Sequence, residues 1–210
     1  ILHFNNLPDN PPFKLMLVET PLSITSFFRP WKKSSDFAQP EIFFWPERGA
    51  TFNVNFKGLK NVHEKKFPAS MTKMMSMLII LESIDKGIIK WDEMVTVSAN
   101  ASSMGGSQIL LETNEQMSVS DLFKGIAVAS GNDAVVALAE KIAGTEDMFV
   151  DMMNKRAQEL GLTNTNFKNC HGLHDANHYS SAYDISIIAR ELVKHEKLFE
   201  YTSIYEDYLR

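Results

Sequence analysis

Apolar residues recur at helical spacing from about residue 67 onward. Met74, Met77, Leu78 and Leu81 are separated by one, three or four positions, as on one face of an α-helix. Pro68 lies just before this pattern, and proline is favoured at the first position of a helix. The pattern therefore predicts a helix that begins near Pro68.

Capping residues and glycines predict where further helices begin and end. Ser118 and Ser181 are each followed three positions later by an aspartate, the spacing of a capping box. Glycine is favoured just after a helix because it adopts the left-handed conformation without a steric penalty. Helices are thus predicted over residues 67–87, 118–127, 133–142, 146–160 and 181–194, with glycines at 87, 144 and 161, an extended stretch over 93–97 and a turn at Gly105-Gly106.

The first sixty residues differ from the rest. Seven of the eight prolines and nine of the fourteen phenylalanines lie there, and frequent proline prevents long helices. Residues Glu41 to Trp45 and Thr51 to Phe56 are short enough and apolar enough for strands. We predict that residues 1–60 form an irregular Pro/Phe-rich segment and that residues 61–210 form a mostly helical unit.

Composition excludes several classes of protein. The chain has 210 residues, of which 44% are apolar and 22% charged, close to the averages for globular proteins. A net charge of −5 without a block of like charges gives no indication of nucleic-acid binding. The sequence contains no run of eighteen apolar residues, so no membrane span is predicted. The single cysteine, Cys170, excludes a disulfide within the chain.

Two Ser-x-x-Lys pairs occur, Ser70–Lys73 and Ser83–Lys86. Residues three apart on a helix share one face, so the lysine amine can take the proton of the serine hydroxyl and make it a nucleophile. About one such pair is expected by chance in a chain of this composition. Spacing alone therefore does not choose between them.

The surroundings favour the first pair. Ser70 lies in the first turn of its predicted helix, where free N–H groups can support an oxyanion. Lys73 is flanked by methionines, and apolar surroundings favour a neutral amine. Ser130-Gly-Asn132 lies between two predicted helices, where Gly131 permits a tight backbone and the exposed hydroxyl and amide can face the first helix.

Four sequence segments carry a resemblance to a known family. They are Phe67-Pro-Ala-Ser-Met-Thr-Lys73, Gly105-Gly-Ser-Gln-Ile109, Ala129-Ser-Gly-Asn-Asp-Ala134 and His178-Tyr-Ser-Ser-Ala-Tyr-Asp184. Through these segments, residues from about 61 to 210 resemble the serine-type D-alanyl-D-alanine carboxypeptidases, the low-molecular-weight penicillin-binding proteins. A serine–lysine motif with a second serine motif is known for these enzymes and for β-lactamases.

The resemblance implies a role for each candidate residue. Ser70 would attack the carbonyl between the two terminal D-alanines of a peptidoglycan stem peptide and form an acyl-enzyme, while Lys73 takes its proton. Ser130 would relay a proton to the departing D-alanine. Asn132, with Gly131 beside it, would bind the substrate amide. β-Lactams would acylate the same serine, and neither a cofactor nor a metal is expected.

The resemblance also implies an α+β fold, a helical cluster packed on an antiparallel sheet, with the sheet incomplete in this chain. The family's third motif, Lys-Thr-Gly, does not occur in the 210 residues. We therefore expect a chain truncated before that motif, whose own activity is open. The family implies an extracytoplasmic bacterial location with membrane association through a C-terminal anchor that is absent here.

Three other interpretations stay open. A β-lactamase would need a Glu-x-x-Leu-Asn motif, and Glu159-Leu-Gly-Leu162 is followed by Thr163 instead of asparagine. A zinc site could use Cys170, His171, His174 and His178, but they lie in a predicted loop rather than on one helix face. A family fragment without turnover would keep the helices and lack the chemistry.

Overall fold

A computed structural model of the protein describes residues 13–16, 41–44, 61–204 and 207–208. Among the first sixty residues, strands β1 (Phe13–Met16) and β2 (Glu41–Phe44) pair antiparallel, with Phe13 opposite Phe44. The strand predicted at Glu41 to Trp45 is thus confirmed to within one residue. The strand predicted at Thr51 to Phe56 lies outside the described residues, and the division of the chain at residue 60 stays a prediction.

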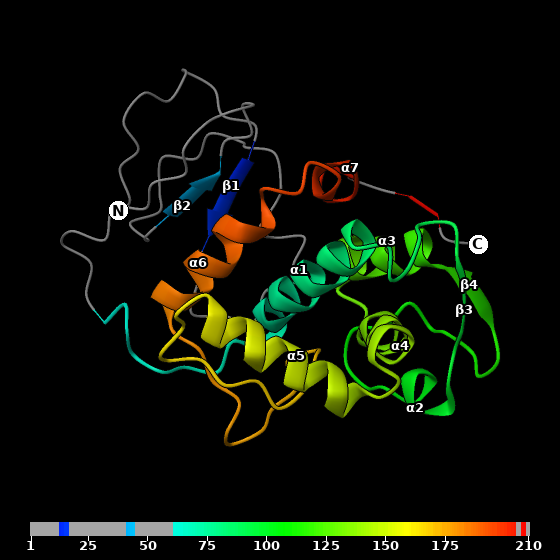
Figure 1. The fold of residues 1–210 in the computed structure, drawn as a ribbon, viewed down its shortest axis with the longest axis horizontal. Coiled ribbons are helices and arrows are strands. Elements are labelled where there is room, and N and C mark those ends of the chain that lie inside the picture. The colour runs from blue at the N-terminus through cyan, green and yellow to red at the C-terminus, as the bar shows by residue number, and fades with distance from the viewer. Residues whose placement is uncertain (1–12, 17–40, 45–60, 205–206, 209–210) are drawn as a thin grey trace.

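Residues 61–204 form a helical cluster with one small two-stranded sheet (Figure 1). Five helices were predicted in this region, and all five are present. The short helices α2 and α7 and strand β4 were not predicted. The elements are η2, a 3₁₀ turn (Ala69–Met71), α1 (Thr72–Asp85), β3 (Met94–Thr96), α2 (Ala99–Ser102), β4 (Gln116–Ser118), α3 (Val119–Ala129), α4 (Asn132–Ala143), α5 (Glu146–Glu159), α6 (Ala182–Leu192) and α7 (Leu198–Thr202).

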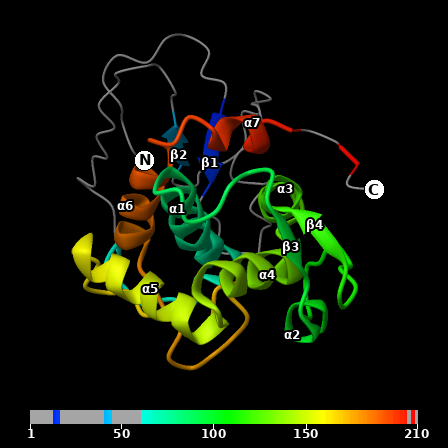
Figure 2. The same ribbon diagram turned by 45° about the vertical axis from the view of Figure 1, so that its right-hand side comes forward.

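Helix α1 is the central element of the cluster. It contacts α3, α4, α5 and α6, and every residue from Thr72 to Leu81 is buried. A helix buried all round is apolar on every face, which explains why the methionines and leucines of α1 extend beyond one stripe. Figures 1 and 2 show α1 in the middle, with α6 on one side and the paired strands β3 and β4 on the other.

The helix ends follow the predicted local chemistry. The hydroxyls of Ser118 and Ser181 accept hydrogen bonds from the backbone N–H groups of Asp121 and Asp184, so both capping boxes begin their helices as predicted. Gly144 follows α4 with a φ of +87°, a conformation that glycine adopts readily. Local sequence therefore positions the ends of α3, α4 and α6.

The α+β class is confirmed, with a single two-stranded antiparallel sheet in residues 61–204. Strand β3 pairs with β4, and these strands contact α4 and α3 respectively. The large buried side chains include Phe123, Phe149 and Phe167, which lie on α3, on α5 and in the loop after α5. None of the helices in the described ranges has the length and apolarity to cross a bilayer.

Candidate active site

Ser70 lies in the 3₁₀ turn that precedes α1, two residues before the α-helix itself begins. The predicted helix start near Pro68 is thus a tighter turn, and Ala69 has a φ of +47°. Gly172 packs directly against this residue, because a Cβ on Gly172 would lie 1.9 Å from the Ala69 carbonyl oxygen. The serine is therefore presented by a constrained turn and remains half-buried.

Lys73 is fully buried one turn after Ser70. Its ammonium donates a hydrogen bond to the His171 carbonyl oxygen at 2.8 Å. Burial lowers the pKa of Lys73 from its usual 10.5 to about 8, and the Asp133 carboxylate partly opposes this effect. Burial also raises the pKa of the Cys170 thiol well above its usual value, so the thiol is neutral near pH 7. Lys73 is thus buried, but the groups that act on its amine include polar ones, the His171 carbonyl and the Asp133 carboxylate.

Ser130 and Asn132 lie where α3 ends and α4 begins, as predicted. Both were predicted to be exposed, which is wrong: Ser130 is 0% exposed and Asn132 is 4% exposed. Within the described residues, neither Ser130 Oγ nor Asn132 Oδ1 has a hydrogen-bond partner. Buried polar atoms without partners are rare in folded proteins, so these two atoms are candidates to bind a ligand.

The tight backbone at this junction is made by Ser130, not by Gly131. Ser130 has a φ of +58°, whereas the φ of Gly131 is −59°. Gly131 is needed for space instead, because a Cβ there would lie 3.0 Å from Oδ1 of Asp133. A left-handed serine is uncommon, and such backbone conformations concentrate at functional sites.

Asp133 is a structural residue of the site to which the sequence assigned no role. Its carboxylate accepts hydrogen bonds from the backbone N–H groups of Ile109, Leu111 and Ala134 at 2.8–3.1 Å. Asn132 adds two bonds to the same segment, from its Nδ2 to the Gly105 carbonyl at 2.6 Å and from its N–H to the Ser107 carbonyl at 2.7 Å. These contacts fasten residues 105–111 beside the Ser130–Asn132 junction.

The loop from Cys170 to His178 contacts the start of α1. His178 accepts a hydrogen bond from the Lys168 N–H at Nδ1 and contacts Thr72 Oγ1 through Nε2 at 2.8 Å. His171 Nδ1 accepts from the Leu173 N–H at 3.1 Å. In the described part of the chain, no group of three or more His, Cys, Asp or Glu side chains could hold a metal ion.

Comparison with known proteins now identifies the family. The family model described as D-alanyl-D-alanine carboxypeptidase matches residues 58–210, which include every candidate residue named above. The chain belongs to the D-alanyl-D-alanine carboxypeptidase family. The chain is 58% identical over 151 residues to the D-alanyl-D-alanine carboxypeptidase DacF of Bacillus subtilis, a match that covers 72% of this chain and 39% of DacF.

Solved structures of relatives share the fold. The D-alanyl-D-alanine carboxypeptidase DacD of Francisella tularensis superposes with a TM-score of 0.66 at 38% identity, covering 68% of this chain and 35% of that one. Penicillin binding protein 6B of Escherichia coli has a TM-score of 0.65 at 39% identity, covering 68% of this chain and 46% of that one. The chain thus spans between a third and a half of the length of these relatives.

The second serine–lysine pair of this carboxypeptidase-family chain belongs to a different place. Ser83 donates to the Ile79 carbonyl at 2.7 Å within α1, and Lys86 forms an ion pair with Glu82 at 3.7 Å. The Ser83 hydroxyl thus donates to the helix backbone, and the Lys86 ammonium is paired with a carboxylate one turn away. That Ser70–Lys73 is the functional pair stays a prediction.

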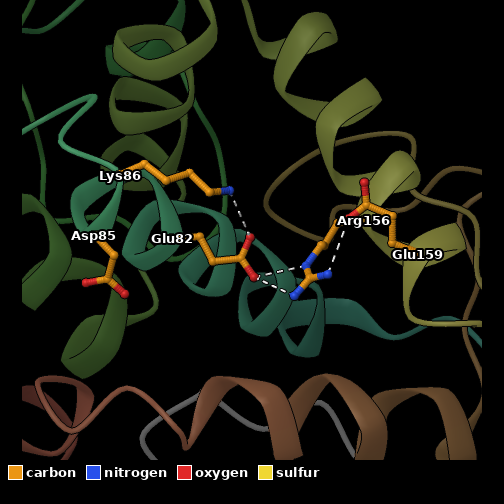
Figure 3. Close-up of a pocket in the computed structure, with 5 residues that line it drawn as sticks. All are labelled: Glu82, Asp85, Lys86, Arg156 and Glu159. Atoms are coloured by element: carbon orange, nitrogen blue, oxygen red, sulfur yellow. Dashed lines mark hydrogen bonds and ion pairs between the residues drawn. The ribbon is translucent and has the colours of Figure 1, made fainter.

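A charged pocket of about 390 Å³ opens beside Lys86, at the C-terminal ends of α1 and α5. Figure 3 shows Lys86 and Arg156 both directed at Glu82, while Asp85 points away from them. Arg156 bonds Oε1 of Glu82 through two nitrogens, at 2.9 and 2.7 Å, and also pairs with Glu159 at 3.3 Å. Glu159, the first residue of the incomplete Glu-x-x-Leu-Asn match, thus lines this pocket.

Proposed function

We propose that the protein is a serine-type D-alanyl-D-alanine carboxypeptidase that removes the terminal D-alanine from peptidoglycan stem peptides. The observation that carries the proposal is the buried Lys73 amine, one turn from Ser70, with a pKa lowered to about 8. Membership of the carboxypeptidase family supports it. An amine of this pKa is neutral often enough near neutral pH to act as a base, whereas an ordinary lysine is not.

The first chemical step uses Ser70 and Lys73. With a pKa of about 8, about a tenth of the Lys73 amines are neutral at pH 7. The neutral amine accepts the Ser70 proton as the serine oxygen bonds to the carbonyl carbon between the two D-alanines. The Ser70 N–H, at the beginning of the helix, donates to the oxyanion, and each such donor is typically worth about 2.7–4 kcal/mol. The product of this step is an acyl-enzyme.

Ser130 is proposed to pass a proton to the departing D-alanine amine. Its hydroxyl is buried and has no protein partner within the described residues, so it is available to both accept and donate. The proton taken up by Lys73 leaves through Ser130 as the C–N bond breaks. Water then hydrolyses the ester, releasing the shortened peptide and restoring the Ser70 hydroxyl.

Asn132 is proposed to bind the substrate backbone, beside Gly131. Its Nδ2 already donates to the Gly105 carbonyl, while its buried Oδ1 accepts nothing from the described residues. An acceptor buried in this way is satisfied by a donor N–H, and a peptide substrate carries one on either side of the scissile bond. The asparagine therefore suits a peptide amide and orients it over Ser70.

β-Lactams are proposed as inhibitors, because they present a strained amide to the same serine. A similar solved structure is named a penicillin binding protein. The substrate places the protein outside the cytoplasmic membrane of a bacterium, and membrane association through a further segment is part of this proposal.

The proposal is tested by labelling the protein with a fluorescent penicillin and separating it under denaturing conditions. We expect a covalent label in the unaltered protein, no label in Ser70→Ala, and full labelling in Ser83→Ala. Ser83→Ala is a matched control, because it removes the serine of the other Ser-x-x-Lys pair, which lies near the C-terminal end of α1. Equal labelling of Ser70→Ala and the unaltered protein would contradict the assignment of the nucleophile.

A second candidate function is acylation without turnover. It is the interpretation, left open by the sequence, of a family fragment that keeps the helices without turnover. Release of D-alanine from a synthetic peptide ending in D-alanyl-D-alanine distinguishes the two candidates. Turnover that disappears in Ser70→Ala supports the carboxypeptidase, whereas labelling with penicillin but no released D-alanine supports a binding protein that does not turn over.

A further inference from the structure

The loop from Cys170 to His178 makes a series of contacts with the turn that carries Ser70. The His171 carbonyl accepts the Lys73 ammonium, and Gly172 packs against the Ala69 carbonyl. One turn further along α1, Ser76 donates to the Cys170 carbonyl at 2.6 Å. The loop backbone therefore accepts two hydrogen bonds from side chains of α1 and packs against the 3₁₀ turn that precedes this helix.

His178 connects this loop to α1 through a hydrogen bond between two side chains, its own and that of Thr72. Its Nδ1 accepts a hydrogen bond from the Lys168 N–H at 3.1 Å, so in the neutral ring the proton is on Nε2. Nε2 then donates to Thr72 Oγ1 at 2.8 Å. The ring is 1% exposed and lies edge-on to Phe167, with centroids 5.7 Å apart. Both nitrogens and one edge of the ring are thus held in place.

Thr72 is the first residue of α1 and lies between Ser70 and Lys73 in the chain. It is fully buried, and its N–H donates to the carbonyls of Ala69 and Ser70. We infer that His178 is a positioning residue for the Ser70–Lys73 pair and acts through the hydroxyl of Thr72. The inference rests on the proposed function, because it assigns Ser70 and Lys73 to the chemistry.

The energetic reason is that acyl transfer depends on the placement of the nucleophile and its base. A displacement of about 1 Å from the productive arrangement can reduce a rate by about a hundredfold. The turn that holds Ser70 is a 3₁₀ turn with a left-handed residue, Ala69, so its own backbone preferences do not maintain it. An external hydrogen bond at Thr72 supplies the missing restraint.

The test compares the second-order rate constant for acylation by a fluorescent penicillin among four variants. Thr72→Val removes the acceptor, and His178→Asn removes the donor at the position of Nε2. Each is expected to lower the rate constant at least about tenfold, and the double variant is expected to be no slower than the slower single variant. His178→Gln, which can place an amide N–H near the position of Nε2, is expected to recover at least half of the loss on a logarithmic scale.

Asn154→Ala is the matched control for general loosening of the same region. The Asn154 side chain bonds both the N–H and the C=O of Phe167, at 2.8 and 2.9 Å, which anchors the segment next to His178 from α5. We expect this variant to lower the melting temperature as much as His178→Asn while changing the acylation rate constant less than about twofold. Equal slowing of Asn154→Ala and His178→Asn would overturn the inference.

Hydrogen exchange of the peptide covering residues 67–77 provides a readout that does not need activity. We expect faster exchange in His178→Asn and Thr72→Val, and unchanged exchange in Asn154→Ala. If the unaltered protein is not acylated at all, the proposed function fails, and hydrogen exchange still decides the positioning role. Normal acylation together with normal exchange in His178→Asn would overturn the inference and leave the proposed function intact.

Discussion

The ammonium of Lys73 donates a hydrogen bond to the backbone carbonyl of His171, which lies 98 residues later in the chain, at 2.8 Å. A carbonyl oxygen accepts a hydrogen bond from the ammonium but carries no full negative charge, so this contact does not pair the ammonium with a counter-ion. Burial then dominates and brings the pKa of Lys73 to about 8. The base of the proposed reaction is thus prepared by a backbone group of a distant loop.

Burial of Lys73 predicts a pH dependence of stability. Because its folded pKa of about 8 lies below the usual 10.5, the unfolded chain binds more protons between these values, and the free energy of unfolding rises with pH across that window. The full effect is about 3 kcal/mol. Urea unfolding at pH 7.5, 9 and 10.5 should show this rise in the unaltered protein and a smaller rise in Lys73→Met. Parallel curves for the two proteins would contradict a lowered pKa.

The same pKa predicts the pH profile of acylation. The rate constant for acylation by a β-lactam should increase about tenfold from pH 7 to a plateau above pH 8–9, as the neutral fraction of Lys73 approaches one. Stopped-flow fluorescence with a labelled penicillin measures it. Lys73→Arg should be inactive across this range because a guanidinium does not release its proton. A flat profile in the unaltered protein would exclude Lys73 as the base.

Two buried histidines predict sensitivity to acid. Burial lowers the pKa of His171 and of His178 to about 4, so the unfolded chain binds more protons between pH 6.5 and pH 4. Stability is therefore lost as the pH falls through that window, by at most about 3 kcal/mol for each histidine. His178→Gln should reduce the loss, measured by urea unfolding at pH 4.5 and 6.5. The exposed His174→Gln serves as the control, and an equal reduction there would contradict the prediction.

The close packing of Gly172 on Ala69 leaves no room for a larger side chain at position 172. Gly172→Ala would place a methyl group 1.9 Å from the Ala69 carbonyl oxygen, and residue 172 also has a φ of +92°, which strains any residue other than glycine. We therefore expect the free energy of unfolding to fall by about 2–5 kcal/mol. Gly144→Ala is the matched control, with a φ of +87° and nothing within 4 Å of the added Cβ. It should lose about 1–2 kcal/mol. Equal losses in thermal unfolding would show that the turn adapts.

The hydrogen bonds of the Asp133 carboxylate to residues 109–111 should contribute to the stability of the folded protein. Asp133→Asn keeps the size of the side chain but leaves one acceptor oxygen for the N–H groups of Ile109, Leu111 and Ala134, so we expect a loss of about 2–4 kcal/mol. Asp121→Asn, in the partly exposed capping box of α3, should lose less than about 1 kcal/mol. Urea unfolding measures both, and equal small losses would contradict the role of Asp133.

Several features of the fold follow from short stretches of sequence. The helices α3 and α6 begin at Ser118 and Ser181 because a side-chain oxygen and a backbone N–H three residues later meet within one turn. Gly144 ends α4 for an equally local reason. Local reasoning was less accurate at Ser70, where a helix was predicted from Pro68. Contact with Gly172, about a hundred residues later, accompanies the tighter turn there.

The burial of Ser130 and Asn132 could not be predicted from their loop position. Loops are usually exposed, but here residues 105–111 fold back over the junction and Asp133 holds them there. A pairing of residues more than twenty positions apart leaves no periodic signal in the sequence. The same reason explains why Asp133 was given no role, although it lies within a phrase that identified the family.

The sequence alone determined the family and most helix boundaries and predicted Ser70–Lys73 with Ser130 and Asn132 as the site, because these depend on residue identity and on neighbours within one or two turns. Only the tertiary structure decided that Lys73 is fully buried against the His171 carbonyl, that Ser130 is left-handed, and that His178 reaches Thr72. Burial and long-range hydrogen bonds are properties of the packed chain. They determine the pKa of Lys73 and the positions of the Ser130 and Thr72 side chains, which cannot be obtained from residue identity alone.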